Sequence, residues 1–399
     1  MRVTQVVISL LVAVMILSVS ASAFAAVDSV DILIKALIDR KVITEDDASS
    51  IRAEIAALRQ DEDAAKTSFN VTGKRPIKLS GYVQERYTSS SQAGTHDTFE
   101  AKRVRLGLAG DATTNVDFNI LFDLAGSKSA LTSATLTTSP TTSLATKSAN
   151  FAKPLLLDAA FGYKLSNGRK ISIGQFKVPF GLESYTSDAA LDTINRTAVT
   201  EALVPGRDNG SSGRDVGIQY SGVKPLNEDG SSQIEYYLGL FDGAGINVAD
   251  DNGVKDFAGR VVWKPGVDGL SLGLAQYSGK ATSANLNHNR TGAEAVYLHG
   301  PWTVKGEYIW AKDAAVKKNG WYGTLVRQLN DSAQAVVRYD RLDPNTAAAG
   351  DATNTLTLGL NYFLNKDGYT RWQLNYEKHG EQGTQVKNDL LLAQFQAGF

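Results

Sequence analysis

The 399-residue sequence contains no cysteine, which excludes disulfide bonds, thiol nucleophiles and cysteine-ligated metals. Proline is scarce, with 9 residues against 36 glycines, so glycine supplies most of the breaks between segments. The formal net charge of −1 gives no reason to expect a nucleic acid as partner. The four histidines have no partners at metal-ligand spacing, so we expect neither a metal site nor a cofactor.

Long apolar runs are also missing, except at the start of the chain. Residues 6–19 are almost wholly apolar, Arg2 is the single positive charge before them, and an A-F-A stretch follows at residues 23–25. This pattern is typical of a signal peptide, so we expect residues 1–25 to be removed on export. A membrane anchor is the alternative, but the apolar core is short and a cleavage site follows it. No later stretch of 18 apolar residues occurs, so the sequence predicts no transmembrane helix in the mature chain.

Residues 28–65 show a helical period. Thr44 is a favourable N-cap, and an apolar seam with spacings of 3, 4 and 3 runs from Ala48 to Leu58. Two heptads are too short for a stable isolated coiled coil, so a hairpin packing on its own chain and a small oligomeric coiled coil both stay open. We assign residues 26–73 to a periplasmic helical segment and linker.

From Ile77 onward the apolar period changes to two, the period of a β-strand. Sixteen such segments lie near residues 77–87, 98–110, 114–124, 154–165, 169–178, 213–221, 233–241, 256–264, 269–278, 290–299, 301–311, 319–330, 334–342, 354–364, 369–379 and 389–399. Most are 9 to 12 residues long, which suits a tilted strand that crosses a bilayer.

The connections between these segments alternate in length. Short turn sequences such as Ser166-Asn-Gly168 follow the even-numbered segments. Long gaps follow the odd-numbered ones, namely 125–153, 179–212, 242–255, 343–353 and 279–289. This alternation and the even strand number predict an all-β fold for residues 74–399, a 16-stranded antiparallel transmembrane β-barrel. Its apolar face, with the tryptophans and Phe399, would contact outer-membrane lipid, and its polar face would line a water-filled lumen.

The predicted lumen face carries charges of both signs. Its basic residues outside the second strand include Lys78, Arg86, Arg260, Lys305, Arg338 and Arg371, and its acidic residues include Asp117, Asp123, Asp158, Asp215, Glu235, Glu307, Asp340 and Glu377. Total charge therefore leaves the choice between anions and cations open, because the charges at the narrowest point decide it.

The gap at residues 179–212 is the candidate for that narrowest point. Structureless loops of this length are usually functional, and this one contains apolar residues such as Leu191, Ile194 and Leu203 beside Arg196 and Arg207. We expect the segment to fold into the lumen and constrict it.

Several stretches resemble the phosphate-selective porin O and P family of Gram-negative outer-membrane channels. They are F-E-A-K-R-V-R-L-G-L-A-G at residues 99–110, I-G-Q-F-K-V-P-F-G-L-E at 173–183, R-D at 207–208, G-R-D-V-G at 213–217 and G-L-F-D-G at 239–243. The resemblance implies a 16-stranded barrel that is usually trimeric, with a third outer loop that narrows the pore. The best-known members conduct phosphate-like anions along a ladder of arginines.

Lys102, Arg103 and Arg105 match the family's basic cluster on the second strand, whereas no strand here shows three or more arginines at every second position. Our hypothesis is that these three residues face Arg196 and Arg207 across a constriction that attracts small anions such as phosphate, because guanidinium groups present fixed donors to oxyanions. A non-selective or sugar-accepting porin is the alternative. A barrel enzyme is less favoured, because no serine and histidine stand together at a recognisable spacing.

The last strand predicts the remaining features. Leu391, Phe395 and Phe399 would face lipid, whereas Gln394 and Gln396 would face water. A terminal phenylalanine resembles the signal that the outer-membrane assembly machinery reads. We therefore expect localisation in the outer membrane of a Gram-negative bacterium, as a homotrimer.

Overall fold

The computed structural model describes residues 68–70, 75–125, 155–366 and 368–399. Gly81–Gly398 form one compact unit, and the described residues before Gly81 belong, with Phe399, to a second unit. The predicted signal peptide, helical segment and coiled-coil seam lie outside the described residues.

Strands make up most of the described chain. Their bounds are β1 (Ser68–Asn70), β2 (Pro76–Ser90), β3 (Thr98–Asp111), β4 (Val116–Asp123), β5 (Leu155–Lys164), β6 (Lys170–Lys177), β7 (Arg214–Pro225), β8 (Ser232–Phe241), β9 (Asp256–Pro265), β10 (Leu270–Ala281), β11 (Leu286–His299), β12 (Trp302–Asp313), β13 (Val316–Asn330), β14 (Ala333–Asp343), β15 (Thr353–Phe363), β16 (Arg371–Glu381) and β17 (Leu390–Gly398).

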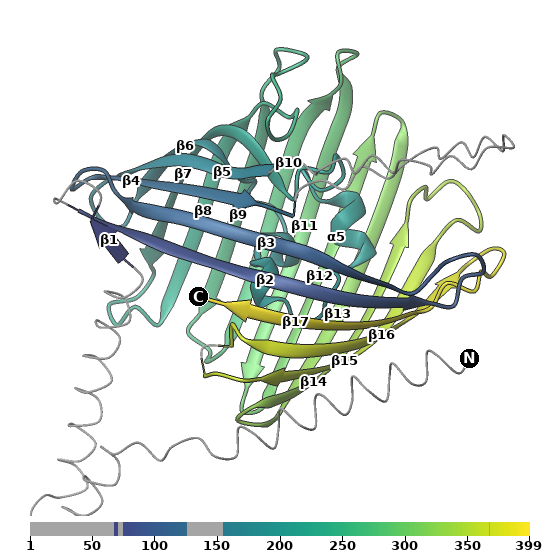
Figure 1. Cartoon of the computed structure of the whole chain (residues 1–399). Helices are drawn as coiled ribbons and strands as arrows, with labels where there is room; N and C mark the ends of the chain where they lie inside the picture. Colours follow the sequence, from purple (N-terminus) through teal and green to yellow (C-terminus); the bar gives the residue numbers. More distant parts are fainter. Residues whose placement is uncertain (1–67, 71–74, 126–154, 367) are drawn as a thin grey trace, which may run out of the picture. The chain divides into compact units, whose positions relative to one another are not determined.

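Strands β2 to β17 form a closed ring. Each strand pairs with its neighbour in sequence, and β17 pairs back antiparallel with β2, where Phe395 lies opposite Glu85. Figure 1 shows these two strands, from opposite ends of the chain, side by side. Closure removes every free strand edge, which lipid could not satisfy with hydrogen bonds. The predicted 16-stranded antiparallel barrel is confirmed, and β1 is a short additional strand paired with the beginning of β2.

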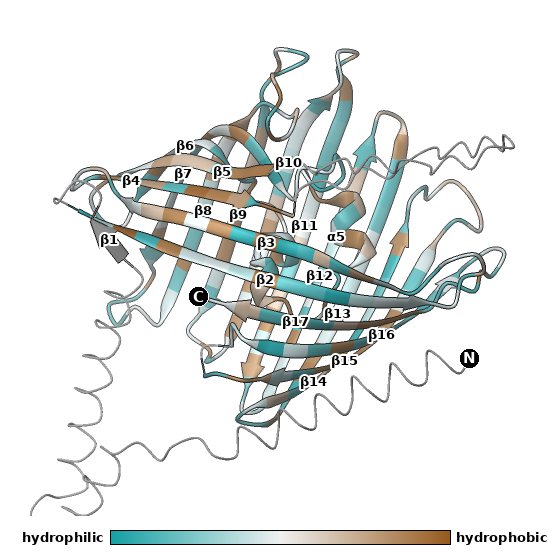
Figure 2. Cartoon of the chain, viewed as in Figure 1, coloured by the Kyte–Doolittle hydropathy of each residue, from teal (hydrophilic) through white to brown (hydrophobic). Residues whose placement is uncertain are grey.

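Apolar and polar residues are interspersed along the strands of the barrel wall, as the brown and teal segments in Figure 2 show. Trp263, Trp302 and Trp310 are exposed on the outside, Trp310 to 50%. Polar side chains such as Gln84 and Gln373 are buried inside. The predicted assignment of faces follows from the period of two of a β-strand.

The hairpin formed by β10 and β11 is longer than the sequence predicts. The expected long gap at residues 279–289 is wrong, because β10 and β11 continue and leave only residues 282–285 as the turn. Lys280 still pairs with Asn287 there, although the apolar alternation has ended. Strand pairing needs only backbone N–H and C=O groups. It therefore continues beyond the lipid-facing part of the strands, where apolar and polar side chains alternate.

The segment between β6 and β7, residues 178–213, is called the lumen loop below. It contains α4 (Leu182–Tyr185), the 3₁₀ turn η1 (Asp188–Ala190) and α5 (Ala198–Leu203). The Thr197 hydroxyl caps α5 by accepting from the Thr200 N–H at 3.1 Å. No helix among the described residues is both long enough and apolar enough to cross a membrane.

The lumen loop lies inside the ring of strands, as α5 shows in Figure 1. Val199 and Leu203 of α5 pack in one apolar cluster with Phe241 and Ile309 of the wall. The predicted inward fold of this segment is confirmed. One consequence contradicts the sequence-based expectation that Gln394 and Gln396 face water. Both are buried, and Gln396 donates to the carbonyl of Ala189 at 3.2 Å, because the loop fills that part of the lumen.

Candidate pore constriction

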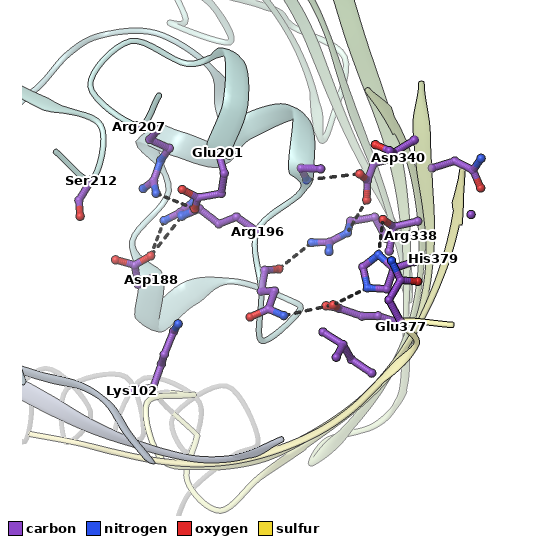
Figure 3. A pocket seen from close by; sticks show the side chains of 18 of the residues that line it. Lys102, Asp188, Arg196, Glu201, Arg207, Ser212, Arg338, Asp340, Glu377 and His379 are labelled. Atoms are coloured by element: carbon purple, nitrogen blue, oxygen red, sulfur yellow. Dashed lines mark hydrogen bonds and ion pairs between the residues drawn. The ribbon is translucent and has the colours of Figure 1, made fainter. Parts of the chain in front are cut away.

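A cavity of about 560 Å³ lies between the lumen loop and the barrel wall. Strand β3 and the loop form one side, and strands β14 to β16 form the other (Figure 3). All five residues predicted for the constriction line it, namely Lys102, Arg103, Arg105, Arg196 and Arg207. The structure therefore brings together residues that are separated by about a hundred positions in the sequence.

Asp188 of the lumen loop lies among three of these arginines. Its carboxylate is 2.8 Å from Nη2 of Arg196, 3.2 Å from Nη2 of Arg105 and 3.5 Å from Nη2 of Arg103. The side chain is buried. Burial alone would raise the pKa of Asp188, but the charges of Arg103, Arg196 and Arg105 outweigh it and hold the pKa well below its usual value. Asp188 is therefore ionised and offsets part of the positive charge.

Arg207 is the second loop arginine of the cavity. Its Nε donates to the Ser184 hydroxyl at 2.9 Å and its Nη1 to Glu201 at 3.0 Å. Burial and, next, the like charge of Arg196 lower the pKa of Arg207 to about 10. The guanidinium remains protonated at neutral pH. Burial and the crowding of positive charge both disfavour its charged form, which is why the pKa is lowered.

The opposite side of the cavity has the other sign. Arg338 and Asp340 of β14, with Glu377, His379 and Glu381 of β16, line it. Figure 3 shows Arg338, Asp340, Glu377 and His379 on the side of the cavity opposite Arg207, Asp188 and Lys102.

Formal charges quantify the difference between the two sides. The basic side, on β3 and the lumen loop, has five cations and two carboxylates (Asp188 and Glu201), so 5 − 2 gives +3. The acidic side, on β14 and β16, has one cation and three carboxylates, so 1 − 3 gives −2 without His379. The cavity is thus polarised across its width, because the two signs come from different strands.

The other predicted lumen cations hold the loop against the wall. Five of them contact it, in these pairs: Arg86 with Asn195, Lys305 with Asp192, Arg338 with Thr193, Arg371 with Ala189, and Arg260 with the ring of Tyr185. Lys78 is exposed. It is the third residue of β2 and belongs to the unit that ends at Ser80. Of these six residues only Arg338 lines the cavity.

Sequence reasoning placed Asp123 on the lumen face but missed that Asp123 and Asp188 are the counter-charges of the basic cluster. Asp123 lies directly opposite Arg105 in the β3–β4 ladder, and its Oδ2 accepts from Arg105 Nε at 2.8 Å. The short turn at residues 112–115 fixes this register, so a count outward from the turn would have found the pair. No such signal exists for Asp188, which belongs to another part of the chain. Within the described residues no group of three or more His, Cys, Asp or Glu side chains could hold a metal ion.

A sequence model described as phosphate-selective porin O and P matches residues 77–282 and 274–399. The chain belongs to that family. It is an outer-membrane porin, and the family and fold are those of a channel for small solutes. No curated protein matches the chain by sequence.

Solved structures of porins share the fold of this porin at low sequence identity. An anion-selective porin from Comamonas acidovorans is 16% identical, with a TM-score of 0.57 over 82% of this chain and 100% of its own. Salmonella typhi OmpF, in a complex with daunomycin, is 12% identical, with a TM-score of 0.55 over 83% and 100%. The trimer form of Vibrio cholerae OmpT is 12% identical, with a TM-score of 0.51 over 81% and 99%. Identities this low support the barrel architecture alone.

Proposed function

We propose that this porin conducts small anions, phosphate among them, by passive diffusion. Lys102, Arg103, Arg105, Arg196 and Arg207 form the anion-attracting side of its constriction. The observation that carries the proposal is the convergence of these five cations on one side of a single cavity, with only two carboxylates among them. Selectivity in a water-filled pore is decided by the charges at its narrowest section, so a side of formal charge +3 favours anions.

The electrostatics support a role in attraction more than in tight binding. Arg103 and Arg105 share Asp188, so their charge is partly offset, and an anion would meet a moderate positive potential. Conduction needs binding that is weak enough to release the solute. Arginine also matches oxyanions through a planar fork of donors, which suits phosphate.

The test is the reversal potential of the full chain in a planar bilayer across a KCl gradient. We expect anion preference, and we expect the double change Arg103→Ala and Arg105→Ala to reduce it by removing two of the five cations. A matched control is the double change Arg169→Ala and Arg327→Ala, which removes two arginines that do not line the cavity. Cation preference, or a preference that survives the loss of Arg103 and Arg105, would contradict the proposal.

A non-selective or sugar-accepting porin is the alternative function. It is favoured by the near balance of the whole cavity, where six cations meet five carboxylates. Saturation of the current by an oligosaccharide, with no effect of phosphate, would support this alternative.

Further features belong to the same proposal. We propose a homotrimer, as in the trimer form of Vibrio cholerae OmpT. Residues 1–25 as signal peptide, residues 26–73 as a periplasmic segment and Phe399 as the signal for the outer-membrane assembly machinery stay predictions from the sequence. So does the absence of an enzymatic activity.

A further inference from the structure

The acidic side of the cavity contains a buried carboxylate with spare bonding capacity. Glu377 is only 3% exposed, and its Oε2 accepts from the Asn195 side-chain amide at 3.1 Å. Its Oε1 has no hydrogen-bond partner among the described residues. Among the described residues, the only basic side chain within ion-pair distance of Glu377 is the imidazole of His379, whose Nε2 is 3.7 Å from Oε2. Figure 3 shows Glu377 pointing from the barrel wall toward the loop.

Asp340 repeats this arrangement on the neighbouring part of the wall. It is 1% exposed, and its Oδ1 accepts from the Ala198 N–H at 3.3 Å. Its Oδ2 has no hydrogen-bond partner among the described residues and lies 3.9 Å from Arg338 Nε, beyond hydrogen-bond distance. Two buried carboxylate oxygens on one side of the cavity therefore lack a donor.

The basic side has the complementary deficit. Arg207 is 7% exposed, and its Nη2 has no acceptor among the described residues. Leaving one polar atom of a buried charged group without a hydrogen-bond partner costs free energy, and a ligand that supplies the partner recovers part of it. A simple anion can satisfy only the arginine side. A molecule with an anionic group at one end and an ammonium group at the other can satisfy both.

We infer that the cavity binds small zwitterions, with a phosphate or carboxylate group on the basic side and an ammonium group at Glu377. The volume of about 560 Å³ is ample for a solute of amino-acid size. The inference rests on the proposed function, since the same basic residues take the anionic end. It adds a second recognition element, the Glu377 carboxylate, which distinguishes anions that also carry an ammonium group from those that do not.

The experiment compares probes that differ only in the ammonium group. The full chain is inserted in a planar bilayer in KCl, and the concentration that blocks half of the current is measured for phosphoethanolamine and for ethyl phosphate. β-Alanine and propionate form the second pair and distinguish a carboxylate from a phosphate anion. We expect the zwitterion of at least one pair to block at a concentration about tenfold lower, the worth of one charged hydrogen bond.

The variants assign the effect to Glu377. Glu377→Gln is expected to bring the ratio of the two half-blocking concentrations close to one, whereas Glu228→Gln, at an exposed turn, keeps it. Asp340→Asn is the second variant, expected to lower the ratio, in case Glu377→Gln does not assemble. Equal block by both members of each pair in the unmodified porin overturns the inference, and so does a ratio that persists in Glu377→Gln.

The two proposals fail in different ways. If ethyl phosphate blocks an anion-preferring channel, but phosphoethanolamine blocks no better than ethyl phosphate and β-alanine no better than propionate, the proposed function stands and zwitterion recognition falls. If the channel prefers cations and ethyl phosphate does not block it, the proposed function falls.

Discussion

Asp188 Oδ2, on the lumen loop, lies 3.2 Å from Arg105 Nη2, on strand β3. The same carboxylate binds Arg196 of the loop, so one buried acid connects the loop to the barrel wall. Removing one partner of a buried ion pair leaves an uncompensated charge and is strongly destabilising. Asp188 therefore has two effects on this porin, because it positions the loop and it lowers the charge of the basic side by one.

The change Asp188→Asn is expected to strengthen anion preference. It raises the formal charge of the basic side from +3 to +4, since 5 − 1 replaces 5 − 2. One unit charge several ångströms from the path is worth about a threefold change in the anion-to-cation permeability ratio. Reversal potentials across a KCl gradient measure this ratio. Asp229→Asn, at an exposed turn, serves as control, and a ratio that falls in Asp188→Asn would count against the assignment of the basic side.

The contribution of Asp188 and Glu183 to the docking of the loop is expected to depend on pH only in strongly acidic solution. Burial would raise the pKa of Glu183, but Arg338 and Arg196 outweigh it and lower the pKa, as the arginines do for Asp188. A carboxyl group whose pKa is lowered on folding contributes stability above its unfolded pKa and loses it as the pH falls through the folded pKa. These two carboxylates should therefore still hold the loop at pH 5, and Asp188 should release it only well below pH 3.8, the usual pKa of Asp.

Single-channel recordings between about pH 7 and pH 3 test this expectation, with current noise as the sign of a loosened loop. Asp188→Asn removes one of the two titrating groups, so its low-pH transition should be smaller. A transition centred near pH 5 in the unmodified porin would show that another group controls the loop.

Arg338 is expected to limit the conductance. Besides the cavity of about 560 Å³ it lines a second cavity of about 190 Å³, and among the described residues it alone lines both. Its guanidinium donates to the carbonyl of Asn195 at 2.8 Å and to Glu183 at 3.3 Å, and these bonds hold the side chain where it borders both cavities. Arg338→Ala should join them and raise single-channel conductance roughly twofold, because conductance follows the narrowest section.

Two controls separate this effect from a general loss of charge. Arg338→Lys keeps the charge and much of the volume and should change the conductance less than Arg338→Ala. Arg327→Ala removes an arginine that stacks on Trp302 and lines neither cavity, and should leave the conductance as it is. Equal conductance of Arg338→Ala and the unmodified channel would mean that solutes pass elsewhere.

The apolar contacts between the lumen loop and the barrel wall are expected to stabilise the folded barrel. Leu203 is 1% exposed and packs with Phe241 and Ile309. Leu203→Ala should cost about 2–5 kcal/mol, the range for a buried leucine truncated to alanine, and should make the current noisier. Heat modifiability on gels measures the stability. Leu274→Ala is the matched control, since Leu274 is 67% exposed on the outer face, and a similar loss in both variants would show that the inner packing is not special.

The barrel can be predicted from the sequence, because the pattern that indicates it lies within each strand. Side chains of a strand alternate between two faces, so Trp372, Leu374 and Tyr376 on one side and Gln373 on the other report a wall between lipid and lumen. Short turns fix the register of neighbouring strands, which is why the Arg105–Asp123 pair was within reach of the sequence. Clustering of Lys102, Arg103 and Arg105 follows from adjacency on one strand.

The path of the lumen loop was decided only by the tertiary structure. The sequence predicted that residues 179–212 enter the lumen, because their apolar content does not suit water. It could not predict that Asp188 meets Arg105, 83 residues away, or that Ile194 binds Asn375 across 181 residues. Such contacts depend on how a closed ring brings distant strands around one segment, and no local period encodes that. For the same reason Gln394 and Gln396, polar residues on the lumen face, are buried and not in contact with water. The charged side chains of the cavity, such as Arg105 and Asp188, are already paired with one another in the protein.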